Sequence, residues 1–156
     1  MILNKDAILK VLQKYQRRML IVEDKVSTAP DSEIELWRWL RIVLKKLGSD
    51  GMSSDESTVE DDIEIVYKTK QMAWRRNLDK EMDLIDAQRI RELNPFAKQG
   101  SKPVRRFRNA GFPVSTRPPV AGLPRCFYDD GWFLGRDKRQ KQMRISTEKF
   151  RWMKII

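Results

Sequence analysis

The feature that most constrains this fold is the spacing of apolar residues near the N-terminus, which recur at three- and four-residue steps. Over residues 4–23 this spacing predicts an amphipathic helix, with Asn4 placed as its N-cap. The apolar face comprises Ile8, Val11, Leu12, Tyr15, Met19 and Val22. The turn-forming residues at 26–31 are expected to end this helix.

A second helix is expected to follow and to end at Gly48. Ser32 and Glu35 have the spacing of a capping box, and apolar residues again recur at helical intervals. Together the two patterns predict an antiparallel helical hairpin over residues 1–48. Trp37 and Trp39 should project from opposite sides of the second helix. One is expected inside the hairpin; the other would cover the third helix, the C-terminal segment or a partner.

Residues 49–64 carry seven acidic side chains and no basic one, which predicts a solvated linker extending to about residue 72. A short strand can form within it, because Ile63, Ile65 and Tyr67 alternate with partly polar neighbours.

The segment 73–94 is expected to contain a third helix, from 77 to 93, before Asn94 and Pro95 end the pattern. We expect this helix to dock on the hairpin. Residues 95–156 are different, because six of the seven prolines and five of the seven glycines lie between 95 and 135. An extended basic arm is predicted there, and the aromatic C-terminal segment fits either a helix or a strand. The predicted fold class is therefore mostly α, with a small core.

Charge is divided unequally along the chain. Residues 1–66 hold 10 basic against 13 acidic side chains, a net charge of −3, whereas residues 67–156 hold 22 against 9, a net charge of +13. The basic half is where a polyanion would bind.

The tract 98–117 contains no acidic residue and has two phenylalanines among its basic side chains. Arginine pairs with phosphate and aromatic rings stack on bases, so this composition indicates nucleic-acid contact. The candidate contact residues are Lys98, Lys102, Arg105, Arg106, Phe107, Arg108, Phe112 and Arg117. The alternatives are a solvated basic loop, or an arm that folds on its own acidic linker. Residues 105–108 also fit a short nuclear-import pattern.

Ser53, Ser57 and Thr58 each precede an acidic side chain by three positions, which is the spacing read by an acid-directed kinase. Phosphates there would make the acidic segment more negative. The alternative is a linker kept soluble by its charge.

The sequence offers little for catalysis, because it contains no histidine and only one cysteine, Cys126. Zinc fingers built on Cys and His and histidine-based triads are excluded. Two carboxylate pairs, Asp83 with Asp86 and Asp129 with Asp130, are expected to have structural or surface roles, since metal-dependent chemistry needs a rigid carboxylate scaffold. No cofactor or metal is expected, and the chain is not predicted to be an enzyme.

The single cysteine and the absence of a signal peptide or membrane-spanning run predict an intracellular protein, nuclear or cytoplasmic.

Three stretches carry a family resemblance: LGSDGMSSDES at 47–57, MAWRR at 72–76 and LPRCFYDDGW at 123–132. Together they resemble a multi-copy family of mushroom-forming (basidiomycete) fungi, from about residue 30 onward. Such families look like cargo or remnants of mobile elements. The resemblance implies no known activity and transfers no catalytic residue.

The interpretation is a non-catalytic binding protein whose basic half contacts nucleic acid or another polyanion. The alternative is a protein-interaction or oligomerisation module, in which the basic arm folds on its own acidic linker or on a partner. Self-association through the N-terminal helices is a further expectation.

Overall fold

The computed structural model of the chain describes residues 5–53, 55–60, 64–69, 71–92, 105–107, 115, 117–137 and 141–155. The three strands are described by their backbone. In these residues helix predominates over strand, as the sequence predicted.

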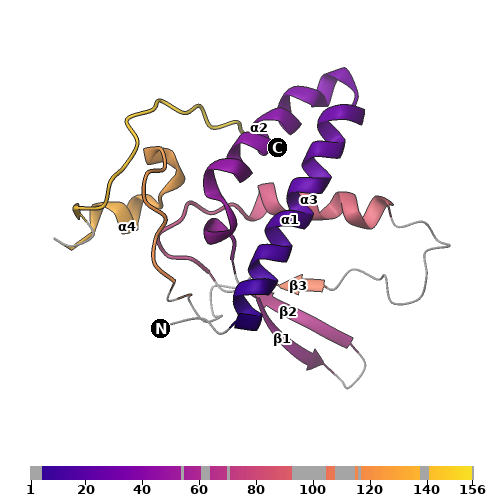
Figure 1. The fold of residues 1–156 in the computed structure, drawn as a ribbon, viewed down its shortest axis with the longest axis horizontal. Coiled ribbons are helices and arrows are strands. Elements are labelled where there is room, and N and C mark those ends of the chain that lie inside the picture. The colour runs from indigo at the N-terminus through magenta and orange to yellow at the C-terminus, as the bar shows by residue number, and fades with distance from the viewer. Residues whose placement is uncertain are drawn as a thin grey trace.

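The two N-terminal helices, α1 (Lys5–Thr28) and α2 (Asp31–Leu47), pack side by side as a hairpin (Figure 1). The chain between them is only two residues long, so the helices must run antiparallel. This confirms the predicted helical hairpin. Asn4, the expected N-cap of α1, lies outside the described residues.

The ends of both helices differ from the sequence prediction. α1 continues to Thr28, so the turn-forming residues Ser27 and Thr28 are helical. Their hydroxyls donate to the carbonyls one turn earlier, at 3.4 and 2.9 Å. The capping box predicted for α2 was wrong, because Pro30 occupies the cap position and no side chain caps the helix. Asp31 and Glu33 instead place negative charge in the first turn, where it complements the helix dipole.

The acidic segment forms regular structure where the sequence predicted a linker. A short 3-10 helix, η1 (Ser49–Gly51), is followed by β1 (Asp55–Glu60) and β2 (Glu64–Thr69). The two strands pair antiparallel in the register Thr58 with Val66. The linker prediction was wrong for these residues, because β-branched and aromatic side chains favour paired strands even among acidic neighbours. The strand expected around Ile65 is present within β2.

The third strand comes from the basic tract. β3 (Arg105–Phe107) pairs parallel with β2, so the sheet order is β1-β2-β3. The acidic strand and the basic strand thus occupy opposite edges of the sheet (Figure 1).

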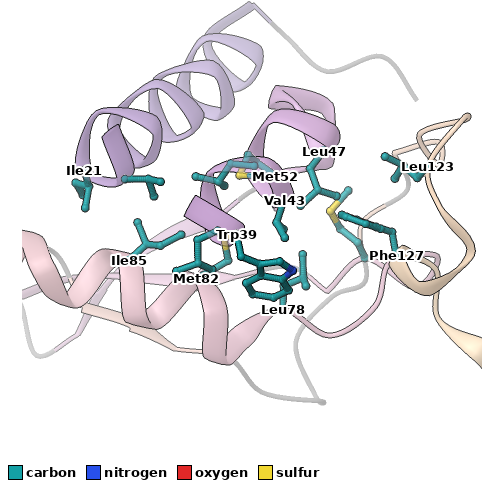
Figure 2. Close-up of a cluster of buried hydrophobic side chains, with 14 of the residues drawn as sticks. Ile21, Trp39, Val43, Leu47, Met52, Leu78, Met82, Ile85, Leu123 and Phe127 are labelled. Atoms are coloured by element: carbon teal, nitrogen blue, oxygen red, sulfur yellow. The ribbon is translucent and has the colours of Figure 1, made fainter. Parts of the chain in front are cut away.

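The third helix, α3 (Asp79–Glu92), lies where the sequence predicted it. It begins after Asn77, whose side-chain oxygen accepts the Asp79 N–H at 2.9 Å and forms the turn that starts the helix. The α3 side chains Met82 and Ile85 face the hairpin (Figure 2). α3 therefore closes the core against α1 and α2.

The core continues into the C-terminal half. Phe127, in the short helix η2 (Arg125–Phe127), is completely buried, and Leu123 lies near it (Figure 2). Tyr128 is buried as well. A five-residue helix, α4 (Asp130–Leu134), follows. Residues 117–137 and 141–155 therefore have little regular secondary structure, but they pack on the hairpin instead of extending away from it.

This packing predicts that the C-terminal half is part of the folding unit. Phe127→Ala should lower the free energy of unfolding by about 3–5 kcal/mol, because it removes a fully buried ring. Leu134→Ala is the matched control, since Leu134 is 76% exposed and its truncation should change stability by less than about 0.5 kcal/mol. Urea unfolding of both variants measures the difference. Equal, small losses would show that residues 117–137 and 141–155 do not belong to the core.

Candidate functional site

Residues 49–53 form a node to which basic side chains from distant parts of the chain converge. The Lys14 ammonium donates to the Ser53 carbonyl at 2.7 Å. The Arg75 guanidinium donates to the Gly51 carbonyl at 2.5 Å and to the Ser53 hydroxyl at 2.9 Å. Lys14 and Arg75 are both buried, so their charges are held by oxygens of the chain instead of by water.

Arg18 connects this node to α3. Its Nε and Nη2 atoms donate to the two carboxylate oxygens of Asp86 at 3.0 and 2.9 Å, and its Nη1 contacts the Met52 sulfur at 3.4 Å. Only 2% of the Arg18 side chain is exposed. A two-bond pair of this geometry is directional, and it fixes α3 relative to α1.

Arg117 closes the node from the C-terminal side. It donates to the carbonyl of Met52 and to the carbonyl of Asp50 at 2.9 Å. Burial lowers the pKa of the Arg117 guanidinium, and the nearby Asp50 carboxylate partly offsets this. We call Lys14, Arg18, Arg75 and Arg117 the basic cluster.

Two residues with other predicted roles, Arg117 and Ser53, take part in this arrangement. Arg117, expected to contact phosphate, binds the backbone of its own chain. Ser53, expected to be phosphorylated, is only 4% exposed and has its hydroxyl bonded to Arg75. A kinase would reach Ser53 only after this node opens. Ser57 and Thr58 lie within β1, paired with Tyr67 and Val66.

The structure covers only part of the predicted nucleic-acid tract. Arg105, Arg106 and Phe107 form β3 at one edge of the sheet. The remaining predicted contacts lie outside the described residues, namely Lys98, Lys102, Arg108 and Phe112. The tract is therefore anchored to the fold at β3 and, through Arg117, at η1.

Further along the chain, residues 141–155 present a second set of basic side chains, which we call the C-terminal basic segment. Its exposed basic residues are Lys141, Arg144, Lys149, Arg151 and Lys154. Within the described part of the chain none of the five forms an ion pair, whereas Lys46 of α2 pairs with Glu148 at 2.7 Å. These five residues were not among the contacts predicted from the sequence, although the density of Lys and Arg near the C-terminus was the available signal.

Aromatic side chains fix this segment to the hairpin. Trp39 of α2 contacts Phe150 and Trp152, with ring centroids 6.4 and 5.0 Å away, and its indole N–H donates to the Arg151 carbonyl at 3.0 Å. Phe127 packs against the same two rings. Trp39 is thus the tryptophan covered by the C-terminal segment, one of the alternatives left open by the sequence. Trp37 is buried as well.

Side chains in this segment alternate. Phe150 and Trp152 turn toward the core, while Lys149 and Arg151 are exposed. This period of two is the period of an extended chain, and it separates apolar from basic side chains without a helix or a strand.

An open cleft of about 1070 Å³ lies beside this segment, lined by both acidic and basic residues around Cys126. Burial raises the pKa of the Cys126 thiol, even though Arg76 and Arg125 act to lower it. The thiol therefore stays protonated near neutral pH and donates to the Phe150 carbonyl at 3.6 Å. A protonated thiol is a poor nucleophile.

The two carboxylate pairs have structural partners. Asp129 accepts the Trp132 N–H at 2.9 Å as the N-cap of α4, and Asp130 pairs with Arg125 at 2.9 Å. Asp86 holds Arg18, as described above. Among the described residues, no group of three or more acidic or cysteine side chains is arranged to hold a metal ion.

Comparison with protein-family models, with curated proteins and with solved structures finds no match for this chain. Within the residues that the structure describes, no helix combines the length and apolarity needed to cross a membrane.

The Arg18 pair gives a test of the basic cluster. Asp86→Ala should lower the free energy of unfolding by about 3–5 kcal/mol, because it leaves a buried guanidinium without its carboxylate. The double variant Arg18→Met/Asp86→Leu removes both charges and should cost less than Asp86→Ala alone. The control is Glu23→Ala, which breaks an exposed pair with Arg41 and should cost at most about 1 kcal/mol. A double variant less stable than Asp86→Ala would contradict this account.

Proposed function

We propose that this chain is a non-catalytic binding protein whose basic C-terminal half contacts nucleic acid or another polyanion. The observation that carries the proposal is that the C-terminal basic segment exposes its basic side chains while its aromatic side chains pack on the core. Five basic side chains there reach solvent without an ion pair among the described residues. Phosphate contact needs such available cations, because each contact releases a counterion from the nucleic acid.

The C-terminal basic segment is also anchored to the core, which supports the proposal. The side chains that alternate with Lys149 and Arg151 pack on Trp39 and Phe127, so the backbone that presents the cations is held in place. A pre-ordered segment loses less conformational entropy on binding than a free arm does. Arg105 and Arg106, which we continue to propose as contacts, lie on β3 at the basic edge of the sheet.

The non-catalytic part of the proposal rests on the missing histidines, on the raised pKa of Cys126 and on the structural roles of Asp86, Asp129 and Asp130. We keep the proposal of an intracellular location, nuclear or cytoplasmic, which rests on the single cysteine and on the basic pattern at 105–108.

A second candidate function is a protein-interaction module. It is favoured by exposed apolar side chains on α1, where Ile8 and Leu9 are about half exposed. The pairing of β3 with β2 also supports it, because part of the basic arm is folded into the same sheet as the acidic segment. β1 and β3 are not neighbours in this sheet, however, because β2 lies between them and separates their backbones by roughly 10 Å.

Salt-dependent titration tests the polyanion proposal. We expect binding of a fluorescent single-stranded oligonucleotide that weakens with salt, with a slope of log affinity against log salt of roughly −3.5 if all five cations engage phosphate. Changing Lys149, Arg151 and Lys154 to Gln should reduce this slope by about 2.

The matched control changes Arg38, Lys45 and Lys80 to Gln, which removes the same charge from exposed positions on α2 and α3. This variant should keep the slope of the unmodified protein. Equal slopes in all three proteins would exclude the C-terminal basic segment as the contact, and no binding at low salt would exclude the polyanion function.

A further inference from the structure

The outward face of α1 carries a symmetric arrangement of exposed side chains. Leu9 is 50% exposed and Leu20 is 72% exposed. Between them, Gln13 and Gln16 are exposed as well. Steps of four, three and four residues place all four on one side of the helix, opposite the buried Arg18.

Along α1, the sequence positions of these residues are symmetric about the point midway between Lys14 and Tyr15. Leu9 and Leu20 are the same number of residues from that point, and so are Gln13 and Gln16. One more step outward in each direction reaches Lys5 and Asp24, both exposed and of opposite charge. If a second α1 is laid antiparallel about this centre, every residue of the set meets its complement.

We propose that a second copy of this chain docks antiparallel on the outer face of α1, related by a two-fold axis that passes between residues 14 and 15. Each Leu9 then packs on Leu20 of the other copy, and Gln13 faces Gln16. Lys5 lies near Asp24 at both ends of the interface. A two-fold interface uses the same patch on both subunits, which is what this self-complementary sequence of side chains provides.

Charge complementarity favours the antiparallel arrangement of the two α1 helices over the parallel one. A parallel pair of α1 helices would place Lys5 against Lys5 and Asp24 against Asp24, whereas the antiparallel pair replaces both repulsions with attractions. Antiparallel helices also align their dipoles favourably. Glu23 is engaged with Arg41 of its own chain at 3.4 Å, so Asp24 is the carboxylate assigned to Lys5.

This inference deepens the second candidate function, the interaction module, and is independent of polyanion contact. One helix per subunit makes a small interface, at the lower end of the range for specific association. The dimer should therefore be weak and should be sought at protein concentrations of about 100 µM.

Charge reversal and mixing test the arrangement in sedimentation experiments without nucleic acid. Lys5→Glu and Asp24→Lys, each alone, should weaken self-association by about tenfold, because each places like charges together at both ends. When the two variants are mixed, the introduced carboxylate of one chain meets the introduced ammonium of the other, and the opposite end keeps the unmodified pair. A heterodimer of unmodified affinity should therefore form. Leu20→Lys should also weaken association.

The matched controls are Lys80→Glu on α3, Glu35→Lys on α2 and Leu134→Lys on α4, which make the same changes at exposed positions elsewhere. They should leave self-association unchanged, and circular dichroism shows whether each variant keeps its helices. An unmodified protein that is monomeric at about 100 µM overturns the proposal. Single variants that associate as tightly as the unmodified protein, or a mixture that fails to recover, overturn it as well. None of these outcomes bears on the binding of the oligonucleotide.

Discussion

The fold depends on four buried or half-buried basic side chains that gather around the segment 49–53 and are hydrogen-bonded to its oxygens or to Asp86. Lys14 and Arg75 donate to its carbonyls, Arg18 reaches past it to Asp86, and Arg117 binds its backbone from the C-terminal side. A buried cation is costly unless oxygens replace its water. Because most of these oxygens come from one short segment, the four charges hold α1, the turn before α3 and the C-terminal half in a single arrangement.

The positive charge of the chain is therefore divided between two uses. One part, the basic cluster, is turned inward and supports the fold. The other part is exposed on the C-terminal basic segment. A net charge of +10 says nothing about this division, although only the exposed part is available to a partner.

The helices could be predicted because their apolar residues repeat with the period of the helix. The basic cluster could not, since Arg18 and Lys14 lie on the buried face of α1 and look like ordinary polar residues of a surface helix. Their partners are distant in the sequence: Asp86 lies 68 residues from Arg18. The strand β1 was missed for a related reason, because its acidic composition suggests solvation while its stability comes from pairing with β2. The basic composition of the C-terminal basic segment was visible in the sequence. The alternation of its basic side chains with anchored aromatic ones became clear only from the packing on Trp39.

We infer that the segment 49–53 joins both halves of the chain into one cooperative unit, and native-state hydrogen exchange would test this inference directly. Three backbone amides beyond residue 75 donate to carbonyls that are distant in the sequence. The Arg76 amide donates to the Phe127 carbonyl, the Asp129 amide to the Trp74 carbonyl and the Ser146 amide to the Leu123 carbonyl. The account predicts that they exchange with the same opening free energy as the core amides of α2, such as that of Leu44. Rapid exchange of these three amides while Leu44 stays protected would contradict it, because the C-terminal half would then open independently of the hairpin.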